Sequence, residues 1–460
     1  MTMRTLSKTS ICILFLMISM KAFSWNEINY RTVEEATYRL YMQKEWKALI
    51  DTGNIALDHG IDYYYLRMRI GIAHYELKQF RASIPHFKKA LIFNEDDATA
   101  KEYLYYSFLF SGMDKEAKSL AREMDQETLT QNEISSVFFE NIGVFSGYSF
   151  IHNPDKFDLK KKYDETTHYL EQSLVDRSYF MELLIRGNPV SKFHLTAGVN
   201  RLGITRHQQV LARNYYVLND YFEFHHENTT QQNQFFLSSR FFPDYTSFFD
   251  FSVNLLNLSY EYTRFSLVDN FNWDYQKTKD EENDYALWLA YTKQTPLFSF
   301  SGSLAHSALN EKTQWQPGLT ATWYPKMNPE LSFSSEFLMQ FQNHENENEM
   351  SSFFSLSATK MIFRNCWAEI LFSTGEINNF TSGNGMIIYN DTDLLRKKAG
   401  INLYYIFKKL NIFIGYSMIE KQSSLINYSQ LPEQVTEIVR TTEEINYSLH
   451  KISGGITWKF

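Results

Sequence analysis

The sequence is poor in cysteine, in long apolar runs and in basic charge, and each shortage excludes a class of protein. Of its two cysteines, Cys12 lies in an N-terminal leader described below, which leaves Cys366 without a partner for an internal disulfide or a cysteine-based zinc site. The one prominent apolar run, 11–20, is too short to cross a membrane as a helix. Acidic residues outnumber basic ones by 53 to 45, so nucleic acid is not an expected partner.

The N-terminus has the pattern of a secretory signal peptide. Arg4 and Lys8 precede the apolar run, and the segment 22–24 that follows has small residues at both ends. We therefore predict a cleaved signal peptide over residues 1–24 and a mature chain with 42 basic and 53 acidic residues, a net charge of −11. An exported chain without disulfides is typical of a Gram-negative envelope protein.

Aromatic residues are abundant, with 38 Phe and 30 Tyr, and from about residue 135 apolar residues recur at every second position. This alternation predicts strands that have one apolar face and one polar face. The mean hydropathy of −0.38 is compatible with a membrane barrel, because only alternate residues of its strands face lipid.

We predict fourteen strands, and most exceed ten residues, which favours membrane-spanning strands over a soluble sandwich. Short connections alternate with long polar ones, as periplasmic turns alternate with extracellular loops in outer-membrane barrels. An even strand number places both barrel ends, and any domain before the barrel, in the periplasm. The predicted strands are 137–151, 168–187, 191–208, 230–242, 246–262, 283–295, 298–310, 313–324, 330–344, 349–363, 366–377, 393–407, 410–422 and 445–460. The predicted outer loops are 152–167, 209–229, 263–282, 343–349, 378–392 and 423–444.

The polar faces of these strands are expected to line the barrel lumen. Such residues either line an open pore or interlock to fill a narrow barrel. Strand number does not decide between the two, because a fourteen-strand barrel lies between filled eight-strand barrels and open porins. The predicted lumen-facing residues are Asp250, Asn254, Glu336, Gln340 and Glu369.

The last strand resembles the terminal strand of bacterial outer-membrane barrels, because it alternates up to the C-terminal aromatic residue Phe460. The resemblance implies that the barrel-assembly machinery recognises Ile456, Trp458 and Phe460. It also implies that lipids of the outer membrane surround the barrel.

Residues 25–133 have helical periodicity and repeat every 34 residues, so that Trp46 aligns with Phe80 and Ala56 with Ala90. A period of 34 residues and the pattern of the copy at 64–97 resemble tetratricopeptide repeats (TPR). In that family the first helix of each unit lines a concave groove, which implies a partner-binding role for tyrosines of this segment. The alternative is that these rings form the core between helices. The tyrosines are Tyr38, Tyr41, Tyr65, Tyr75, Tyr103 and Tyr106.

No catalytic constellation stands out in the sequence. It has no G-x-S-x-G elbow, no P-loop and no HExxH motif, and the acidic run at 280–284 is interpreted as solvated. We expect a protein that is not an enzyme and that needs no cofactor and no metal.

The predicted fold is therefore an N-terminal α-helical repeat domain, 25–133, followed by an antiparallel outer-membrane β-barrel, 134–460. This order resembles surface lipoprotein assembly modulators, and also exopolysaccharide exporters, which carry more repeats. The first resemblance implies that the periplasmic repeats recruit a protein client for export or surface display. The alternatives are a pore for polysaccharide or small solutes and a scaffold that does not transport.

Overall fold

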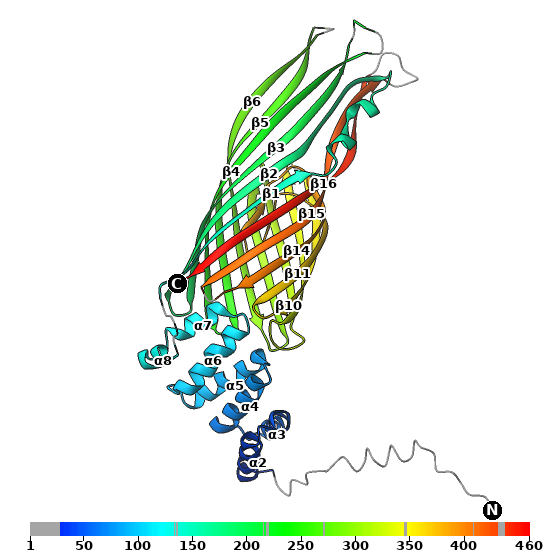
Figure 1. Ribbon diagram of the computed structural model, residues 1–460. Coiled ribbons are helices and arrows are strands. Elements are labelled where there is room, and N and C mark those ends of the chain that lie inside the picture. Colours follow the sequence, from blue (N-terminus) through cyan, green and yellow to red (C-terminus); the bar gives the residue numbers. More distant parts are fainter. Residues whose placement is uncertain are drawn as a thin grey trace, which may run out of the picture.

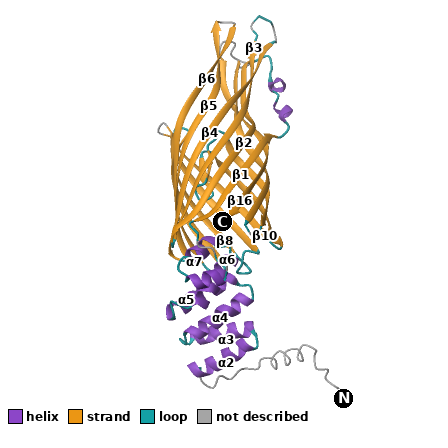
Figure 2. Ribbon diagram, turned by 60° about the vertical axis from the view of Figure 1, so that its left-hand side comes forward, coloured by secondary structure: helices purple, strands orange, loops and turns teal. Residues whose placement is uncertain are grey.

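A computed structural model describes residues 28–132, 134, 137–214, 216–217, 220–269, 272–344, 347–407, 409–430 and 438–460. The predicted signal peptide lies outside these residues. The chain forms a stack of helices followed by a tall barrel, and the helices lie under one open end of the barrel (Figures 1 and 2).

Seven helices are described before the barrel, and they repeat at 34-residue intervals. The first helices of three successive pairs begin at residues 30, 64 and 98, and the second helices begin at 46, 80 and 114. Within the described residues, no helix is long and apolar enough to cross a membrane. The helices are α2 (Tyr30–Met42), α3 (Trp46–Asp58), α4 (Tyr64–Glu76), α5 (Phe80–Phe93), α6 (Ala98–Phe110), α7 (Asp114–Ala121) and α8 (Gln126–Gln131).

Small residues let neighbouring helices approach closely, as the repeat pattern predicts. A Cβ atom on Gly71 of α4 would lie 2.7 Å from the ring of Phe87 in α5. Phe87 and Ala90 are fully buried in the core that α4, α5 and α6 share. A larger residue at position 71 would therefore separate the two helices.

Fourteen antiparallel strands form a closed barrel, which confirms the predicted number and type of strand. The predicted domain boundary after residue 133 falls between α8 and β1. The barrel strands are β1 (Phe139–Ile151), β2 (Thr167–Val190), β3 (Phe193–Arg213), β4 (Tyr221–Asp244), β5 (Ser247–Asp269), β6 (Asn272–Gln294), β7 (Phe298–Leu309), β8 (Lys312–Trp323), β9 (Leu331–His344), β10 (Glu347–Phe363), β11 (Cys366–Ile377), β14 (Leu394–Ile406), β15 (Leu410–Gln430) and β16 (Ile438–Lys459).

The first and last strands close the barrel. β1 pairs with β16 from Asn141 opposite Lys459 to Ile151 opposite Leu449, and the Phe460 N–H donates to the Glu140 carbonyl. The chain enters the barrel and ends at the same rim, beside the helices (Figure 1). We call this rim proximal and the opposite rim distal.

The outer wall is apolar over a continuous band. On β5, Phe249, Phe251 and Leu255 are exposed, whereas the intervening Asp250 and Asn254 are buried on the inner side. The same alternation places Ile456, Trp458 and Phe460 on the outer face of the last strand. A closed barrel with an apolar outer band is the fold of an outer-membrane β-barrel.

The predicted outer loop 343–349 is wrong, because its residues belong to β9 and β10 except 345–346, which lie outside the described residues. Three longer predicted outer loops are also wrong, because their residues continue the strands. Segments 209–229, 263–282 and 423–444 lie largely in β3 to β6 and in β15 and β16, although 431–437 lies outside the described residues. These strands rise above the others at the distal rim (Figure 1). There β2 also pairs directly with β15, from Thr167 to Gln172, and this pairing closes the upper wall. Their polar composition suggested loops, but backbone pairing does not require apolar side chains.

Candidate functional site: a plugged lumen

The connection between β11 and β14 folds into the barrel, and the prediction of an outer loop at 378–392 is therefore corrected. It contains a short hairpin, β12 (Phe380–Ser382) paired with β13 (Ile387–Tyr389). Phe380 and Tyr389 stack face to face with ring centroids 4.3 Å apart, and Phe380 is buried in the apolar cluster inside the barrel. We call residues 378–393 the plug.

Glutamine side chains on β8 and β9 hold one side of the plug through its backbone. Gln316 forms two hydrogen bonds with Thr381, donating to its carbonyl at 2.5 Å and accepting from its N–H at 3.0 Å. Gln340 donates to the carbonyls of Asn378 and Asn379, each at 3.0 Å. A primary amide can donate to a backbone carbonyl and accept from a backbone N–H, as a neighbouring strand does. The glutamines therefore satisfy backbone groups of the plug that would otherwise bind water.

The opposite wall holds the tip of the plug. Asn254 on β5 donates to the Gly385 carbonyl at 2.7 Å, and Gln234 on β4 donates to the Met386 carbonyl at 3.1 Å. The two amides also bond to each other at 2.6 Å. The plug therefore crosses the lumen and joins β4 and β5 to β8 and β9.

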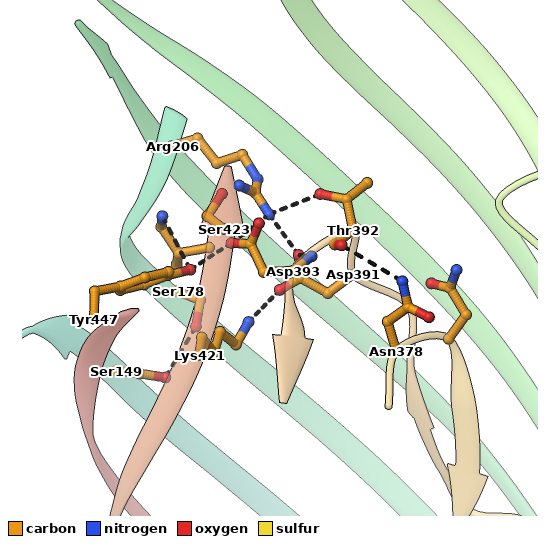
Figure 3. Close-up of polar contacts among 12 residues, drawn as sticks. Ser149, Ser178, Arg206, Asn378, Asp391, Thr392, Asp393, Lys421, Ser423 and Tyr447 are labelled. Atoms are coloured by element: carbon orange, nitrogen blue, oxygen red, sulfur yellow. Dashed lines mark hydrogen bonds and ion pairs between the residues drawn. The ribbon is translucent and has the colours of Figure 1, made fainter. Parts of the chain in front are cut away.

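Charged residues fix the end of the plug to β3, β15 and β16 (Figure 3). Arg206 Nη2 lies 2.5 Å from Asp391 Oδ1 and 3.0 Å from Asp393 Oδ2. Lys421 pairs with Asp391, and the Tyr447 hydroxyl donates to Asp393 at 2.5 Å. We call these five residues the latch. They are largely buried, so removal of one partner leaves a charge without compensation.

Gly385 is required at the tip because its φ of +81° favours glycine and because the wall is close. A Cβ atom there would lie 2.0 Å from Ser252 Oγ and 2.8 Å from Trp288 Cβ. We expect Gly385→Ala to raise the fraction of unseated plugs about tenfold, since left-handed backbone alone costs an L-residue roughly 1–2 kcal/mol. The measurement is the rate at which a polar maleimide labels Thr381→Cys in a Cys366→Ser background. An unchanged labelling rate would contradict the seating of this tip.

Two cavities flank the latch. A distal vestibule of 740 Å³ is lined by acidic residues such as Glu171, Glu282 and Glu444. A second cavity of 480 Å³, which we call the chamber, lies inside the lumen beside the plug. Asp391 lines both cavities, so the latch stands at the boundary between them.

The helical domain closes the proximal rim. Arg81 of α5 donates to the carbonyls of Thr295 at 2.9 Å and Pro296 at 3.2 Å, in the turn between β6 and β7. Its guanidinium also lies over the ring of Tyr324, 3.9 Å from the centroid. Asn328, in the turn between β8 and β9, donates to the Lys78 carbonyl at 2.9 Å. These contacts fix the helices to two proximal turns.

Helix α7 enters the proximal opening. Ser119 Oγ lies 2.8 Å from His194 Nε2 on β3, and His194 Nδ1 lies 2.9 Å from Glu140 Oε1 on β1. This is the order of groups in a hydrolytic triad, but all three side chains are almost fully buried, so we interpret the row as a clamp between helix and wall. Burial raises the pKa of Glu116, whose side chain is almost fully buried on α7.

The predicted lumen-facing residues lie on the inner side of the wall, but their hydrogen-bond and ion-pair partners differ. Asn254 and Gln340 hold the plug, as described above. Asp250 pairs with Arg240 on the neighbouring strand at 2.7 Å. Glu369 accepts from Asn402 and Tyr404, whereas Glu336 lies on the inner face of β9. The latch was not predicted from the sequence. The close spacing of Asp391 and Asp393 was the one feature that could have indicated a charged site there.

The predicted tyrosine groove divides into two groups. Tyr41, Tyr75 and Tyr103 pack against the helical core, as the alternative interpretation expects, and Tyr106 stacks on Phe110. Tyr38 and Tyr65 are 52% and 59% exposed. Arg69 lies between them, 5.3 Å from one ring centroid and 5.9 Å from the other.

Two histidines pack together in the helical domain. The rings of His74 and His86 stack with centroids 5.5 Å apart, and Arg67 Nη1 lies 3.4 Å from His86 Nδ1. Burial, with His74 and Arg67 nearby, lowers the pKa of His86 to about 3. The unfolded chain takes up this proton near pH 6.5 and the folded chain only near pH 3. This contribution to stability is therefore complete above pH 6.5 and is lost as the pH falls toward 3.

We expect a shift from pH 7.5 to pH 5.5 to destabilise the helical domain by about 1 kcal/mol, since pH 5.5 is one unit below the unfolded pKa. The measurement is urea unfolding of the whole protein in neutral detergent, followed by circular dichroism at 222 nm, where helices dominate. His86→Gln serves as the control and should flatten the pH dependence. An acid-insensitive midpoint in the wild type would contradict the assignment.

Comparisons with known proteins concern the fold alone. No protein-family model and no curated protein matches the sequence. The crystal structure of a Pseudomonas aeruginosa FadL homologue covers 77% of this chain and 94% of its own, with 8% identity and a TM-score of 0.44. The P. putida toluene transporter TodX covers 70% and 90%, with 8% identity and a TM-score of 0.42. YrrB, a TPR protein with an unusual peptide-binding site, covers 27% and 73%, with 20% identity and a TM-score of 0.22.

Proposed function

We propose that this protein is an outer-membrane pore for small solutes whose lumen is closed by the plug and by α7. The plug carries the proposal, because many of its contacts with the wall are polar or ionic and can be exchanged for water, although Phe380 and Ile388 also pack on apolar wall residues. The chamber and the vestibule lie on either side of the latch, so displacement of the plug would join them into one path.

The contents of the lumen argue against passage of a folded protein client. The plug crosses the lumen from β4 and β5 to β8 and β9, and α7 occupies the proximal opening. The chamber of 480 Å³ has the size of a small-molecule site, about 300–1,000 Å³, and not of a protein domain. A small solute is therefore favoured over the protein client that the sequence suggested.

In this proposal the barrel is surrounded by outer-membrane lipids after insertion by the barrel-assembly machinery, and the helical domain lies in the periplasm. The helices and the C-terminus lie at the same rim of the barrel (Figure 1). This supports the orientation, since bacterial barrels have both ends of the chain in the periplasm. The distal vestibule would then open to the outside.

The test is ion conductance in planar bilayers. We expect replacement of residues 380–389 by a Gly-Ser linker to convert rare openings of the wild type into a steady conductance. The matched control replaces the same number of residues in the β5–β6 hairpin, 265–274, by a Gly-Ser linker of equal length, which leaves the plug in place. A lumen that stays sealed when 380–389 is replaced and α7 is also released by His194→Leu would overturn the proposal.

A second candidate function is recruitment of a protein partner by TPR-like helices. It is favoured by the exposed pair Tyr38 and Tyr65, since exposed tyrosine residues are typical of binding hot spots. The test is capture of envelope proteins by the whole protein and by Tyr38→Ala/Tyr65→Ala. Tyr41 and Tyr75 are unsuitable for this test, because both pack in the helical core.

A further inference from the structure

We propose that the chamber binds an organic anion with an apolar body, whose acid group is held by Lys398 and Lys451. The inference rests on the proposed pore function and names the class of solute that the pore would carry. Lys398 on β14 and Lys451 on β16 both line the chamber.

Neither of these ammonium groups forms an ion pair with an acid in the part of the chain that the structure describes. The described contact of Lys451 is with the Phe180 ring, whose centroid lies 4.6 Å from Nζ. Lys398 donates to the Tyr389 hydroxyl at 3.3 Å. Ammonium groups inside proteins are normally paired, so two of them in one cavity without an acid partner indicate a place for an anion.

The other charged groups around the chamber leave it positive. Lys421 and Asp391 are also in its wall, but they pair with each other and with Arg206 in the latch. Glu182 is the remaining acid that lines the chamber, and the two remaining lysines, Lys398 and Lys451, exceed it by one positive charge. A bound anion would therefore compensate an existing excess of positive charge.

Apolar side chains line the rest of the chamber, and they explain why the ligand needs an apolar body. Phe145, Phe180 and Phe413 project from the inner faces of β1, β2 and β15, and Leu202 and Leu371 join them in the lining. Glycines make room for these rings, since a Cβ atom on Gly455 would lie 2.1 Å from the Phe145 ring. An aromatic or aliphatic group would bury its surface there.

The experiment is calorimetric titration of the whole protein in neutral detergent with 2-naphthoate. Its uncharged analogue, 2-naphthalenemethanol, measures the contribution of the acid group, and naphthalene-2-sulfonate distinguishes a general anion site from a carboxylate site. We expect both anions to bind at one site per chain and the alcohol to bind at least about tenfold more weakly, the effect of losing one charge-assisted hydrogen bond.

Lys451→Met and Lys398→Met should each weaken naphthoate binding by about tenfold or more. Lys360→Met is the matched control, because Lys360 is exposed on β10 and does not line the chamber. Equal binding of the alcohol, or wild-type affinity in both lysine variants, would overturn the proposal. If the intact protein does not bind naphthoate but the barrel conducts after replacement of 380–389, the ligand class alone is overturned. If the intact protein binds naphthoate but the barrel never conducts, the pore function is overturned.

Discussion

Replacement of both Asp391 and Asp393 by asparagine is expected to unseat the plug and to produce frequent openings of the barrel. Arg206 would then lie buried without a carboxylate, and Lys421 would lose its partner as well. Removal of one side of a buried ion pair costs about 3–5 kcal/mol, which corresponds to a shift of the seated–unseated equilibrium by a factor of roughly 10²–10⁴. The measurement is the frequency of single-channel openings at a fixed voltage.

A matched control separates this effect from a change in net charge. Asp274→Asn/Glu281→Gln removes the same number of charges from exposed positions of β6 near the distal rim. Its opening frequency should equal that of the wild type. The role of the latch is refuted if the Asp391/Asp393 variant gates like this control while both barrels remain folded.

Replacement of His194 by leucine is expected to release α7 from the proximal opening. The Glu140 carboxylate would remain buried without its imidazole partner, and Ser119 would lose its contact with the wall. A buried group that loses its partner costs about 1–3 kcal/mol, so amide exchange in α7 should accelerate roughly 10- to 100-fold. The measurement is hydrogen–deuterium exchange of a peptide that covers Asp114–Ala121.

The double variant Glu140→Gln/His194→Leu provides the control. It removes the unpaired carboxylate along with the histidine, so much of the lost protection of α7 should return. Exchange in the barrel strands should be unaffected in both variants, because the ladder hydrogen bonds of β1 and β3 do not involve these side chains. Unchanged protection of α7 in His194→Leu would show that the clamp does not hold the helix.

The Asp391/Asp393 variant and the His194 variant each test one of the two closures of the lumen. The latch acts near the distal vestibule, and the clamp acts at the proximal rim. If both closures must open for a solute to pass, neither variant alone will reach the conductance of the combined variant. Non-additive effects would then indicate coupling between two parts of the lumen.

The number of strands was predictable because alternation has a physical cause that acts along each strand separately. Phe249, Phe251 and Leu255 face outward while Asp250 and Asn254 face inward, and a period of two fixes this wherever the strand lies in the barrel. The helix starts were likewise predictable from a repeat that brings small and aromatic residues together, as at Gly71 and Phe87. Both patterns are local.

The polar upper strands were mistaken for loops for a related reason. The segment 263–282 does carry apolar residues at alternate positions, and two of them, Phe265 and Trp273, pack against the apolar cluster formed by β2 and β3. Backbone pairing of Tyr262 with Thr278 and of Phe265 with Tyr275 continues regardless of side-chain polarity. The alternation in this segment is short and is followed by the largely charged residues 277–282, so the polar composition of the whole segment favoured a loop.

The sequence by itself determined the barrel, its strand number, the facing of its residues and the helical repeat before it. Only the tertiary structure decided that residues 378–393 enter the lumen, that Arg206 meets Asp391 across 185 positions of sequence, and that α7 closes the other end. The physical reason is the distance along the sequence over which each interaction acts. Periodicity records what each residue requires of its immediate neighbours, whereas the plug, the latch and the clamp depend on long-range pairing that exists only once the barrel has closed.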